Sequence, residues 1–597
     1  MKNIFESRIE RIREEMRKRC IDIFMVFSGD YHGSEYVSEY FKCREYLSGF
    51  TGSAGTLVIT DDKARLWTDG RYFLQAEAEL EGSGIILMRS GMDGVSDIDD
   101  YLKETVSQGD TIGFDGRTVG LQYIQELADE LADANINFDP SACLTDIIWD
   151  DRPLLKTAPV FLLDEKYAGE ASDSKIEKIR KKMELLSADS HIITTLDDIA
   201  WILNLRGSDI PYNPVFLSYL LINRESIYLY TKPDVCDDSV CTYLKKLGVS
   251  LRDYDSFEND LDDHKLVGGK VLADNNSISV AVYDAISDRA EAIWDRNPSS
   301  IMKAKKNSIE MENERQAHIK DGTALTKMIY RLKKNKDIEK LTELDVAAEL
   351  KTLREEQEGF IEESFAAIVA TGENSAVIHY EPDETTNTHI KKDTFLLMDT
   401  GGHYYEGTTD VTRTVAIGTV TYEMKKLYTA VLKGNLRLAA ATVKKCGGTN
   451  IDILARTPLW ELGYDYRHGT GHGVGYLLNV HEGPQSIRIK RVSGEEDTDF
   501  AEGMLTSDEP GVYLPGEYGI RLENLMLTVP RETTQYGDFL QFETLTLAPF
   551  DKECILTEDM TAEDLALLRS YYAKVREKLI PHLSSEEKEW LLEETEL

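Results

Sequence analysis

Hydrophobic and charged residues alternate with helical spacing at two places in the first half of the chain. Residues 7–16 (SRIERIREEM) reappear as residues 174–183 (SKIEKIRKKM), with isoleucine and methionine at matching positions. Apolar residues that recur every three or four positions predict an amphipathic helix at each place. The second copy starts 167 residues after the first, and a repeat of that length predicts two domains of similar design. The alternative is that two surface helices share this charge pattern by chance.

Each predicted helix is followed by apolar runs typical of β-strands. One run begins at residue 21 (IDIFMVFS) and another at residue 191 (HIITTL), and a Gly-Ser turn comes later in each copy. After the turns lie AGTLVIT in the first copy and PVFLSYLLI and SIYLYT in the second. Runs of β-branched and aromatic residues bounded by turn residues predict strands. We therefore expect two α/β domains, residues 1–155 and 156–300.

The third part of the chain begins with a long charged helix. Apolar residues recur at helical spacing through residues 303–335. We expect this domain to span residues 301–545. A C-terminal extension, residues 546–597, is expected to follow, with a strand near its start and helices after it. Its acidic tail contains a Trp-Leu-Leu run at residues 590–592, which we expect to pack on its own subunit rather than on a second one.

Composition and charge narrow the range of functions. The 597 residues are 42% hydrophobic and 29% charged, which is typical of a globular protein, and the net charge is −39. A field of that sign repels the phosphates of nucleic acids and anionic lipids, so we expect neither nucleic acid nor membrane as a partner. The N-terminus is a charged helix rather than a signal peptide, and no run reaches 18 apolar residues. Seven scattered cysteines fit reduced thiols. These features predict a cytoplasmic protein.

Two aspartates occupy neighbouring predicted strands in the third domain. The β-forming segments 394–398 and 411–417 are joined by a Gly-rich connection and carry Asp399 and Asp410 near their ends. A carboxylate at the end of an apolar strand loses hydration, so it needs a basic partner or a metal ion. Arg413 is a candidate partner, although its direction depends on the local twist of the strand.

Further metal-type side chains follow. Two histidines lie four residues apart in H-G-T-G-H-G-V-G, but four glycines exclude the helical zinc motif and predict that extended chain presents His468 and His472. Glu509 and Glu523 lie beside predicted strands, where structure alone disfavours a charge. Four carboxylates and a neutral imidazole balance two divalent ions. Oxygen-rich ligation with one nitrogen favours Mn²⁺ or Co²⁺ over structural zinc.

These residues lie in motifs that resemble one known family. The segments YLSGFTGSAGT, LWTDGRYFLQA, ENSAVIHYEP, DTGGHYYEGTTDVTRT, HGTGHGVGYLLNVHEGP, SDEPGVY and YGIRLEN are similar to those of the three-domain Xaa-Pro aminopeptidases, metallopeptidases with the creatinase/aminopeptidase fold. The resemblance covers nearly the whole chain. It implies two related N-terminal α/β domains, an α/β (α+β) pita-bread catalytic domain with a C-terminal extension, and two divalent metal ions, Mn²⁺ first with Co²⁺ or Zn²⁺ as alternatives.

The resemblance also assigns roles to individual residues. It makes Asp399 a ligand of one ion, Asp410 and Glu523 bridging ligands, and His472 and Glu509 ligands of the other ion. It implies that a hydroxide shared by the two ions attacks the scissile carbonyl. Glu509 is then the expected proton carrier.

Other residues are expected to contact the peptide. His379 and His481 resemble the family's substrate-facing histidines, which stabilise the tetrahedral intermediate or protonate the leaving nitrogen. Each has a simpler interpretation as a loop residue. The full set of expected substrate contacts is Arg71, His379, His468, His472, His481 and Glu509. Arg71 is otherwise an ordinary turn arginine. His403, a small departure from the family pattern, lies outside the five ligands.

The expected function is therefore hydrolysis of the N-terminal Xaa-Pro bond of peptides whose second residue is proline. An Xaa-Pro bond has no N–H, so it requires a dedicated pocket. The first alternative is a prolidase, which shares the five ligands but acts on dipeptides. Others are a non-catalytic binding relative and a metal-free hydrolase of guanidino compounds, both of which tend to lose ligands. By resemblance we also expect a homodimer joined through the C-terminal region.

Overall fold

The computed structural model describes residues 3–263, 266–491 and 496–597, which form two compact units. The N-terminal unit combines the chain up to Leu163 with Glu170–Ser299. The C-terminal unit combines the short segment Asp164–Gly169 with the chain from Ser300 onward. Among the described residues, no helix is both long enough and apolar enough to cross a membrane.

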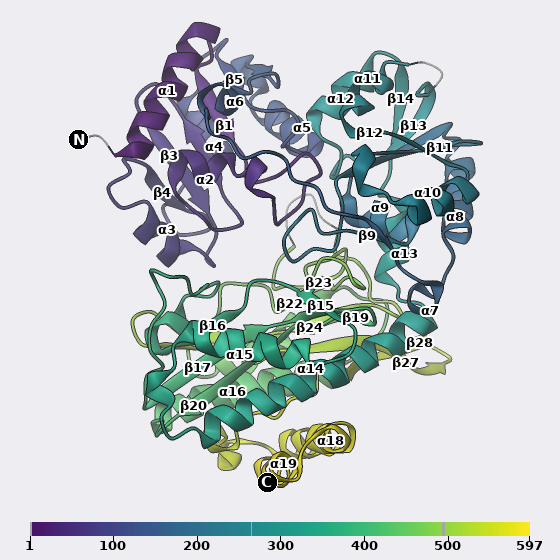
Figure 1. The fold of residues 1–597 in the computed structure, drawn as a ribbon. Helices are drawn as coiled ribbons and strands as arrows, with labels where there is room; N and C mark the ends of the chain where they lie inside the picture. The colour runs from purple at the N-terminus through teal and green to yellow at the C-terminus, as the bar shows by residue number, and fades with distance from the viewer. Residues whose placement is uncertain (1–2, 264–265, 492–495) are drawn as a thin grey trace. The chain divides into compact units, whose positions relative to one another are not determined.

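The N-terminal unit contains two sheets (Figure 1). Each has six strands, and the strand order is the same in both. In both, counted along the chain, the first strand is antiparallel to the second and parallel to the fifth, and a parallel strand lies at each edge. The first sheet has the order β4 (Ile86–Arg89), β3 (Ala64–Thr68), β2 (Thr56–Ile59), β1 (Ile23–Val26), β5 (Thr111–Gly113), β6 (Asn137–Asp139). The second has the order β12 (Val249–Asp253), β11 (Ile227–Thr231), β10 (Ser218–Asn223), β8 (Ser190–Ile193), β13 (Gly269–Ala273), β14 (Ala290–Trp294).

The repeated helices bury equivalent side chains. In α1 (Ile4–Arg19) the buried apolar residues are Ile9, Ile12 and Met16, and in α8 (Ser172–Leu186) they are Ile176, Ile179 and Met183. The two sets occupy the same positions of the repeated motif, so the helices present the same apolar face to their sheets. Shared burial and shared sheet order confirm two related α/β domains and exclude a chance likeness of surface helices.

The C-terminal unit is built around antiparallel strands covered by two helices. Strands β16 (Ile368–Thr371), β17 (Thr394–Thr400) and β20 (Val411–Ile417) form one sheet. Helix α14 (Ser308–Lys334) lies beside α15 (Glu343–Glu355), which packs on β16 (Figure 1). A second sheet has the order β21 (Thr442–Val443), β28 (Gly537–Thr544), β27 (Asn524–Thr534), β24 (Leu505–Asp508).

The C-terminal extension differs from the prediction at its start. Strand β28 ends at Thr544, and residues 545–550 are buried chain outside any strand. The Leu545 N–H still donates to the Leu525 carbonyl, but the following backbone groups bond to side chains: Tyr571 accepts from the N–H of Ala548, and Arg413 donates to the carbonyls of Ala548 and Pro549. The expected strand is therefore wrong, because these side chains replace a neighbouring strand as hydrogen-bond partners.

The predicted C-terminal helices are present as α18 (Ala562–Leu579) and α19 (Ser585–Glu594), which pack on α14. Trp590 and Leu591 are buried, and the Trp590 ring lies 5.7 Å from that of Tyr330 in α14. Leu592 stays 41% exposed. Packing of the tail on its own subunit is thus confirmed for the first two residues of the Trp-Leu-Leu run.

Candidate metal centre

The five predicted metal ligands lie at or beside strand ends of the C-terminal unit. Each lies within, or directly beside, a strand whose residues are largely buried. Asp399 is in β17, Asp410 precedes β20, His472 ends β22 (Gly471–His472), Glu509 follows β24, and Glu523 joins β26 (Tyr518–Arg521) to β27.

Strand pairing brings three of these ends into one neighbourhood. Asp399 on β17 lies opposite Thr412 on β20, and Asp410 directly precedes β20. The Thr412 hydroxyl donates to Glu523 Oε2 at 2.8 Å, and the Glu523 N–H donates to the Thr412 carbonyl at 3.1 Å. Thr412 therefore ties the segment that carries Glu523 to the strand that follows Asp410.

Side-chain atoms of the predicted ligands meet at the imidazole of His472. Its Nε2 lies 3.4 Å from Asp410 Oδ2 and 3.7 Å from Glu509 Oε1. One ligand atom each from Asp410, His472 and Glu523 lies within 4.8 Å of the other two. Such spacing suits a shared cation, because ligand atoms on one ion are separated by a few ångströms.

Glycines make the approach of His472 possible. A Cβ added at Gly471 would lie 2.0 Å from the Ser507 carbonyl oxygen, and one at Gly473 would lie 2.1 Å from that of Glu482. No side chain fits such gaps, so both positions require glycine. The His472 N–H donates to Ser507 Oγ at 2.9 Å. The expectation of extended chain around this histidine is confirmed.

Two arginines take different roles near the aspartates. Arg521 donates to Asp399 Oδ2 through Nη2 at 2.5 Å and Nε at 3.2 Å, which holds that carboxylate from one side. Arg413 instead donates to backbone carbonyls, including that of Glu523 at 2.6 Å. The candidate pairing of Arg413 with Asp410 is not what forms, since the strand twist turns the guanidinium toward these carbonyls.

Electrostatics leave the carboxylates short of positive charge. Burial raises the pKa values of Asp399, Glu509 and Glu523. The negative charges of neighbouring acids raise these pKa values further. Burial lowers the pKa of His472, but its hydrogen bond with Asp410 and the charge of Glu509 outweigh this and raise it to about 9. Within the described residues, Asp399 Oδ1 and Asp410 Oδ1 are buried without a hydrogen-bond partner. Divalent cations would supply both the charge and the contacts, so the donor set fits a metal centre.

Two further predicted histidines lie beside this cluster. The His481 ring is edge-on to that of His472, with centroids 4.4 Å apart. His468 Nδ1 lies 3.9 Å from Glu509 Oε2, and its Nε2 lies 2.9 Å from the hydroxyl of Tyr513. His379 is on the segment after β16, in the same unit. His403 is fully buried and lies 3.0 Å from the Thr408 hydroxyl through Nδ1.

Arg71 belongs to the N-terminal unit. Its guanidinium donates to both carboxylate oxygens of Asp69, at 2.9 and 2.8 Å, within the turn Thr-Asp-Gly-Arg. This geometry agrees with an ordinary turn arginine, and the contact of Arg71 with the peptide stays a prediction.

Sequence reasoning missed three residues of the site. Thr412 binds Glu523, and Tyr513 accepts from Arg521 Nη1 at 2.8 Å. Asp508, directly before Glu509, is fully buried, and in the described chain neither of its carboxylate oxygens has a hydrogen-bond partner. Burial raises its pKa well above the ordinary range. The position of Asp508 beside Glu509 in the S-D-E-P-G motif was the available signal.

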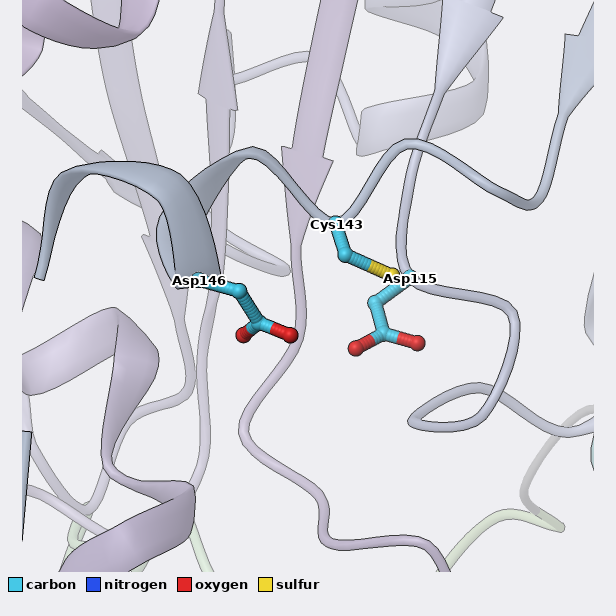
Figure 2. Close-up of side chains that lie close together, drawn as sticks. All are labelled: Asp115, Cys143 and Asp146. Carbon is cyan, nitrogen blue, oxygen red and sulfur yellow. The ribbon is translucent and has the colours of Figure 1, made fainter.

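A second group of metal-type side chains lies in the N-terminal unit. Figure 2 shows Asp115, Cys143 and Asp146, which also offer ligand atoms within 4.8 Å of one another. Here Arg117 Nη2 donates to all three, at 2.7 Å to Asp115, 3.4 Å to Cys143 and 3.2 Å to Asp146. Arg152 binds the other oxygen of Asp146. The guanidinium groups thus supply the positive charge, and burial raises the pKa of Cys143 to about 11.

Family models cover most of the chain. Residues 312–530 match metallopeptidase family M24, and residues 538–597 match the C-terminal region of that peptidase. Residues 8–146 and 151–310 each match a creatinase/prolidase N-terminal domain. These matches agree with the mixed helix and strand architecture and with the repeat in the N-terminal unit.

Similar proteins and structures extend the match to the full length. The chain is 38% identical to Xaa-Pro aminopeptidase 1 of Dictyostelium discoideum, over 96% of this chain and 93% of that protein. It is 35% identical to aminopeptidase P1 of Arabidopsis thaliana, over 96% of both. A crystal structure of X-prolyl aminopeptidase from Caenorhabditis elegans, described as a cytosolic enzyme with a di-nuclear active site, is 32% identical with a TM-score of 0.93 and 99% coverage of both chains. An Xaa-Pro dipeptidase from Bacillus anthracis, 24% identical with a TM-score of 0.50, shares the fold over 64% of this chain and 99% of its own.

Proposed function

This chain belongs to the Xaa-Pro aminopeptidases of metallopeptidase family M24, and we propose that it hydrolyses the N-terminal Xaa-Pro bond of peptides. The convergence of Asp410, His472 and Glu523, with Asp399 and Glu509 beside them, carries the proposal. The relatives that match over the whole chain are named for this activity.

The proposed centre holds two divalent ions, with Mn²⁺ as the first candidate and Co²⁺ or Zn²⁺ as alternatives. The ions would be held by Asp399, Asp410, His472, Glu509 and Glu523. They would supply a partner for the buried oxygen of each aspartate that has no hydrogen bond among the described residues. When bound, such cations polarise a scissile carbonyl and lower the pKa of water. Hard, oxygen-rich ligation supports Mn²⁺.

The chain's own side chains supply positioning and proton transfer. Thr412 and Arg521 orient Glu523 and Asp399 by direct hydrogen bonds. Glu509, at the edge of the cluster, takes the proton from the attacking water. We assign His481, whose ring contacts that of His472, and His379 to stabilising the oxyanion or protonating the proline nitrogen as it leaves. His468 is also assigned to substrate binding, and its hydrogen bond with Tyr513 orients the ring.

The remaining expectations join this proposal. We assign Arg71 to peptide binding on the strength of its motif alone. We also propose domain boundaries at residues 155, 300 and 545. The enzyme is proposed to act in the cytoplasm, as the Caenorhabditis elegans relative does, and to form a homodimer. Sedimentation of the full-length protein tests the dimer directly.

A peptide panel tests the activity. Purified protein with added Mn²⁺, Co²⁺ or Zn²⁺ is assayed by mass spectrometry on Xaa-Pro dipeptides and on Xaa-Pro-Xaa-Xaa peptides, with a chelator control. Release of the first residue from the longer peptides supports an aminopeptidase. Cleavage of dipeptides alone would favour a prolidase, whose fold matches only part of this chain. No cleavage together with absence of bound metal would favour a binding relative or a metal-free hydrolase.

A further inference from the structure

The segment that carries His379 is long and contains little regular structure. Between Thr371, the last residue of β16, and Ile390, it forms the short helix η6 (Gly372–Ala376) and one isolated bridge from His389 to Thr342. Loops of this kind hold a side chain accurately only where their backbone is fixed by other elements. Since the proposed role of His379 requires an accurate position, the contacts that fix this segment bear on catalysis.

One fixed point joins the segment to the strand beside the metal centre. The Gly519 N–H in β26 donates to Ser375 Oγ at 2.7 Å. A Cβ at Gly519 would lie 1.9 Å from the Ser375 carbonyl oxygen, so η6 packs directly on the backbone of β26. That strand ends at Arg521, which binds Asp399. Ser375 is four residues before His379.

The second fixed point is the carboxylate of Glu343, the first residue of α15. Glu343 is fully buried. Its Oε1 accepts from the Thr371 N–H at 2.8 Å and from Asn374 Nδ2 at 2.9 Å. Its Oε2 accepts from the Tyr380 hydroxyl at 2.7 Å and from the Thr388 N–H at 3.1 Å. One side chain thus binds the start, the middle and the end of the His379 segment.

The helix itself does not need this carboxylate. The N-terminus of α15 is already capped by Thr342 and Asp345, which bind each other's backbone N–H groups at 2.8 and 3.2 Å. Every group that faces Glu343 in these contacts is a donor, and a backbone N–H lies against each of its two oxygens. A buried carboxylate satisfies donors on both sides, whereas an amide satisfies one side and opposes the other.

We propose that Glu343 is a positioning residue for catalysis, which holds the segment from Thr371 to Thr388 so that His379 faces the substrate. This inference rests on the proposed function, because it assigns Glu343 a role through His379. Tyr380, next to His379, transmits the restraint, because its hydroxyl binds Glu343 and its ring is buried. The prediction is that loss of the carboxylate lowers turnover without removing metal.

The test is a double-mutant cycle between Glu343→Gln and His379→Ala in the metal-loaded, full-length protein. We expect Glu343→Gln to lower kcat on Xaa-Pro-Xaa-Xaa peptides about 10- to 100-fold, with KM changed less than about 3-fold and metal content unchanged. In the His379→Ala background the same substitution should lower kcat less than about 2-fold, because the residue through which it acts is absent.

Asp345→Asn is the matched control. It removes a carboxylate from the same helix end and weakens the cap, so it should lower thermal stability while leaving kcat unchanged in both backgrounds. Equal losses of kcat in Asp345→Asn and Glu343→Gln would show that Glu343 only stabilises α15, and would overturn the proposal. Losses that multiply in the double mutant would overturn it as well.

A second variant tests the same inference if Glu343→Gln folds poorly. Replacing Asn374 by Ala together with Tyr380 by Phe removes the side-chain donors and keeps the backbone donors and Glu343 itself. We expect kcat to fall at least about 5-fold, again only when His379 is present. Unchanged kcat would reject the inference. If the wild-type protein cleaves no Xaa-Pro peptide, the proposed function fails; if it does and this coupling is absent, only the role of Glu343 fails.

Discussion

The Asp115 cluster of the N-terminal unit and the Asp410 cluster of the C-terminal unit look alike as lists of side chains. Each brings three metal-type ligands within 4.8 Å of one another. In the first, Arg117 donates to all three members, and the side chain of Asp146 is 34% exposed. In the second, the side chain of Asp410 is 5% exposed, and further acids surround it.

The difference lies in where the balancing charge comes from. A guanidinium offers several donors in a fixed plane and can neutralise a partly exposed group of acids permanently. The C-terminal cluster has more carboxylates than nearby cationic side chains. Burial therefore raises the pKa values of its carboxyl groups, because little positive charge offsets the lost hydration. Two aspartate oxygens also have no hydrogen-bond partner among the described residues. Proximity of acidic side chains therefore does not identify a metal site, whereas uncompensated buried charge does.

The largest expected effect is on the C-terminal cluster. Asp410→Ala or Glu523→Ala should lower kcat by about 10³-fold or more and remove bound metal, because the coordination sphere is then incomplete. Metal analysis and peptide assays on the same samples measure both quantities. Asp115→Asn is the control and should keep wild-type metal content and activity. Loss of metal in that control, or near-normal turnover of Asp410→Ala, would contradict the comparison.

The next largest effect should come from metal removal, which should change the thermal stability of the two units differently. Chelation leaves the crowded carboxylates of the C-terminal unit without cations, so its unfolding transition should shift down by about 5 to 10 °C. The N-terminal unit, neutralised by arginines, should not shift. Differential scanning calorimetry before and after chelation, with Mn²⁺ added back, tests this. Equal shifts of both units would mean that the metals also stabilise the N-terminal unit.

In metal-free protein, a buried histidine of the N-terminal unit and the acids of the C-terminal cluster should respond to acid in opposite directions. His191 of the N-terminal unit is fully buried, and burial lowers its pKa to about 4. The unfolded chain therefore binds the extra proton below pH 6.5, so His191 should contribute a loss of up to about 3 kcal/mol as the pH falls to 4. Asp209, whose pKa burial raises to about 6, contributes in the opposite direction. His191→Leu should remove the first contribution, so the variant's N-terminal unit should lose less stability, or gain more, than that of the wild type as the pH falls.

In the C-terminal unit, the raised pKa values of Asp399, Glu509 and Glu523 change stability with pH in the opposite direction to His191. The folded state binds protons that the unfolded state releases, so its stability should rise as the pH falls toward 4.5. His318, with a pKa lowered to about 4 by burial, opposes this but is one group against three. Urea unfolding at several pH values, monitored separately for each unit, measures the two slopes. A C-terminal unit that loses stability as the pH falls, or a slope of the N-terminal unit that is the same in His191→Leu and wild type, would contradict the charge assignment.

The smallest expected effect concerns the arginine that fills the N-terminal cluster. Arg117→Met should destabilise that unit by about 1 to 2 kcal/mol, because Asp115 loses a paired hydrogen bond and Asp146 loses one donor. Urea unfolding gives the value. Catalysis should be unchanged. An additional metal ion bound by this variant would show that Arg117 blocks a competent cation site.

Much of the fold could be predicted because it depends on local patterns. The helices α1 and α8 and the strands β1, β8, β17 and β20 follow from apolar spacing within segments of 4 to 16 residues. The exception is instructive: residues 545–550 have a strand-like pattern, but side chains from distant elements take their backbone hydrogen bonds. Pattern alone does not reveal which partner the backbone receives.

The candidate site was predictable at the level of its motifs. Aspartates at strand ends, a glycine-rich histidine segment and glutamates beside strands indicated carboxylate-rich chemistry. The direction of Arg413 and the bond from Thr412 to Glu523 were not predictable, because each depends on strand twist and on segments about 110 residues apart. The role of Glu343 was not predictable for the same reason. The sequence at the start of its helix does not show whether an acidic residue caps the helix or binds a distant segment. The sequence also did not reveal that the buried carboxyl group of Asp508 has no hydrogen-bond partner among the described residues.

The order of residues alone determined the repeated α/β design, the presence of acidic strand ends and the glycines around His472, because spacing and steric size act locally. Three-dimensional packing decided which acids have an arginine beside them and which do not. Arg117 reaches Asp146 across 29 positions of sequence, and Glu343 reaches Thr388 across 45. Such contacts form only after distant segments have packed together, so the balance of buried charge is a property of the folded chain.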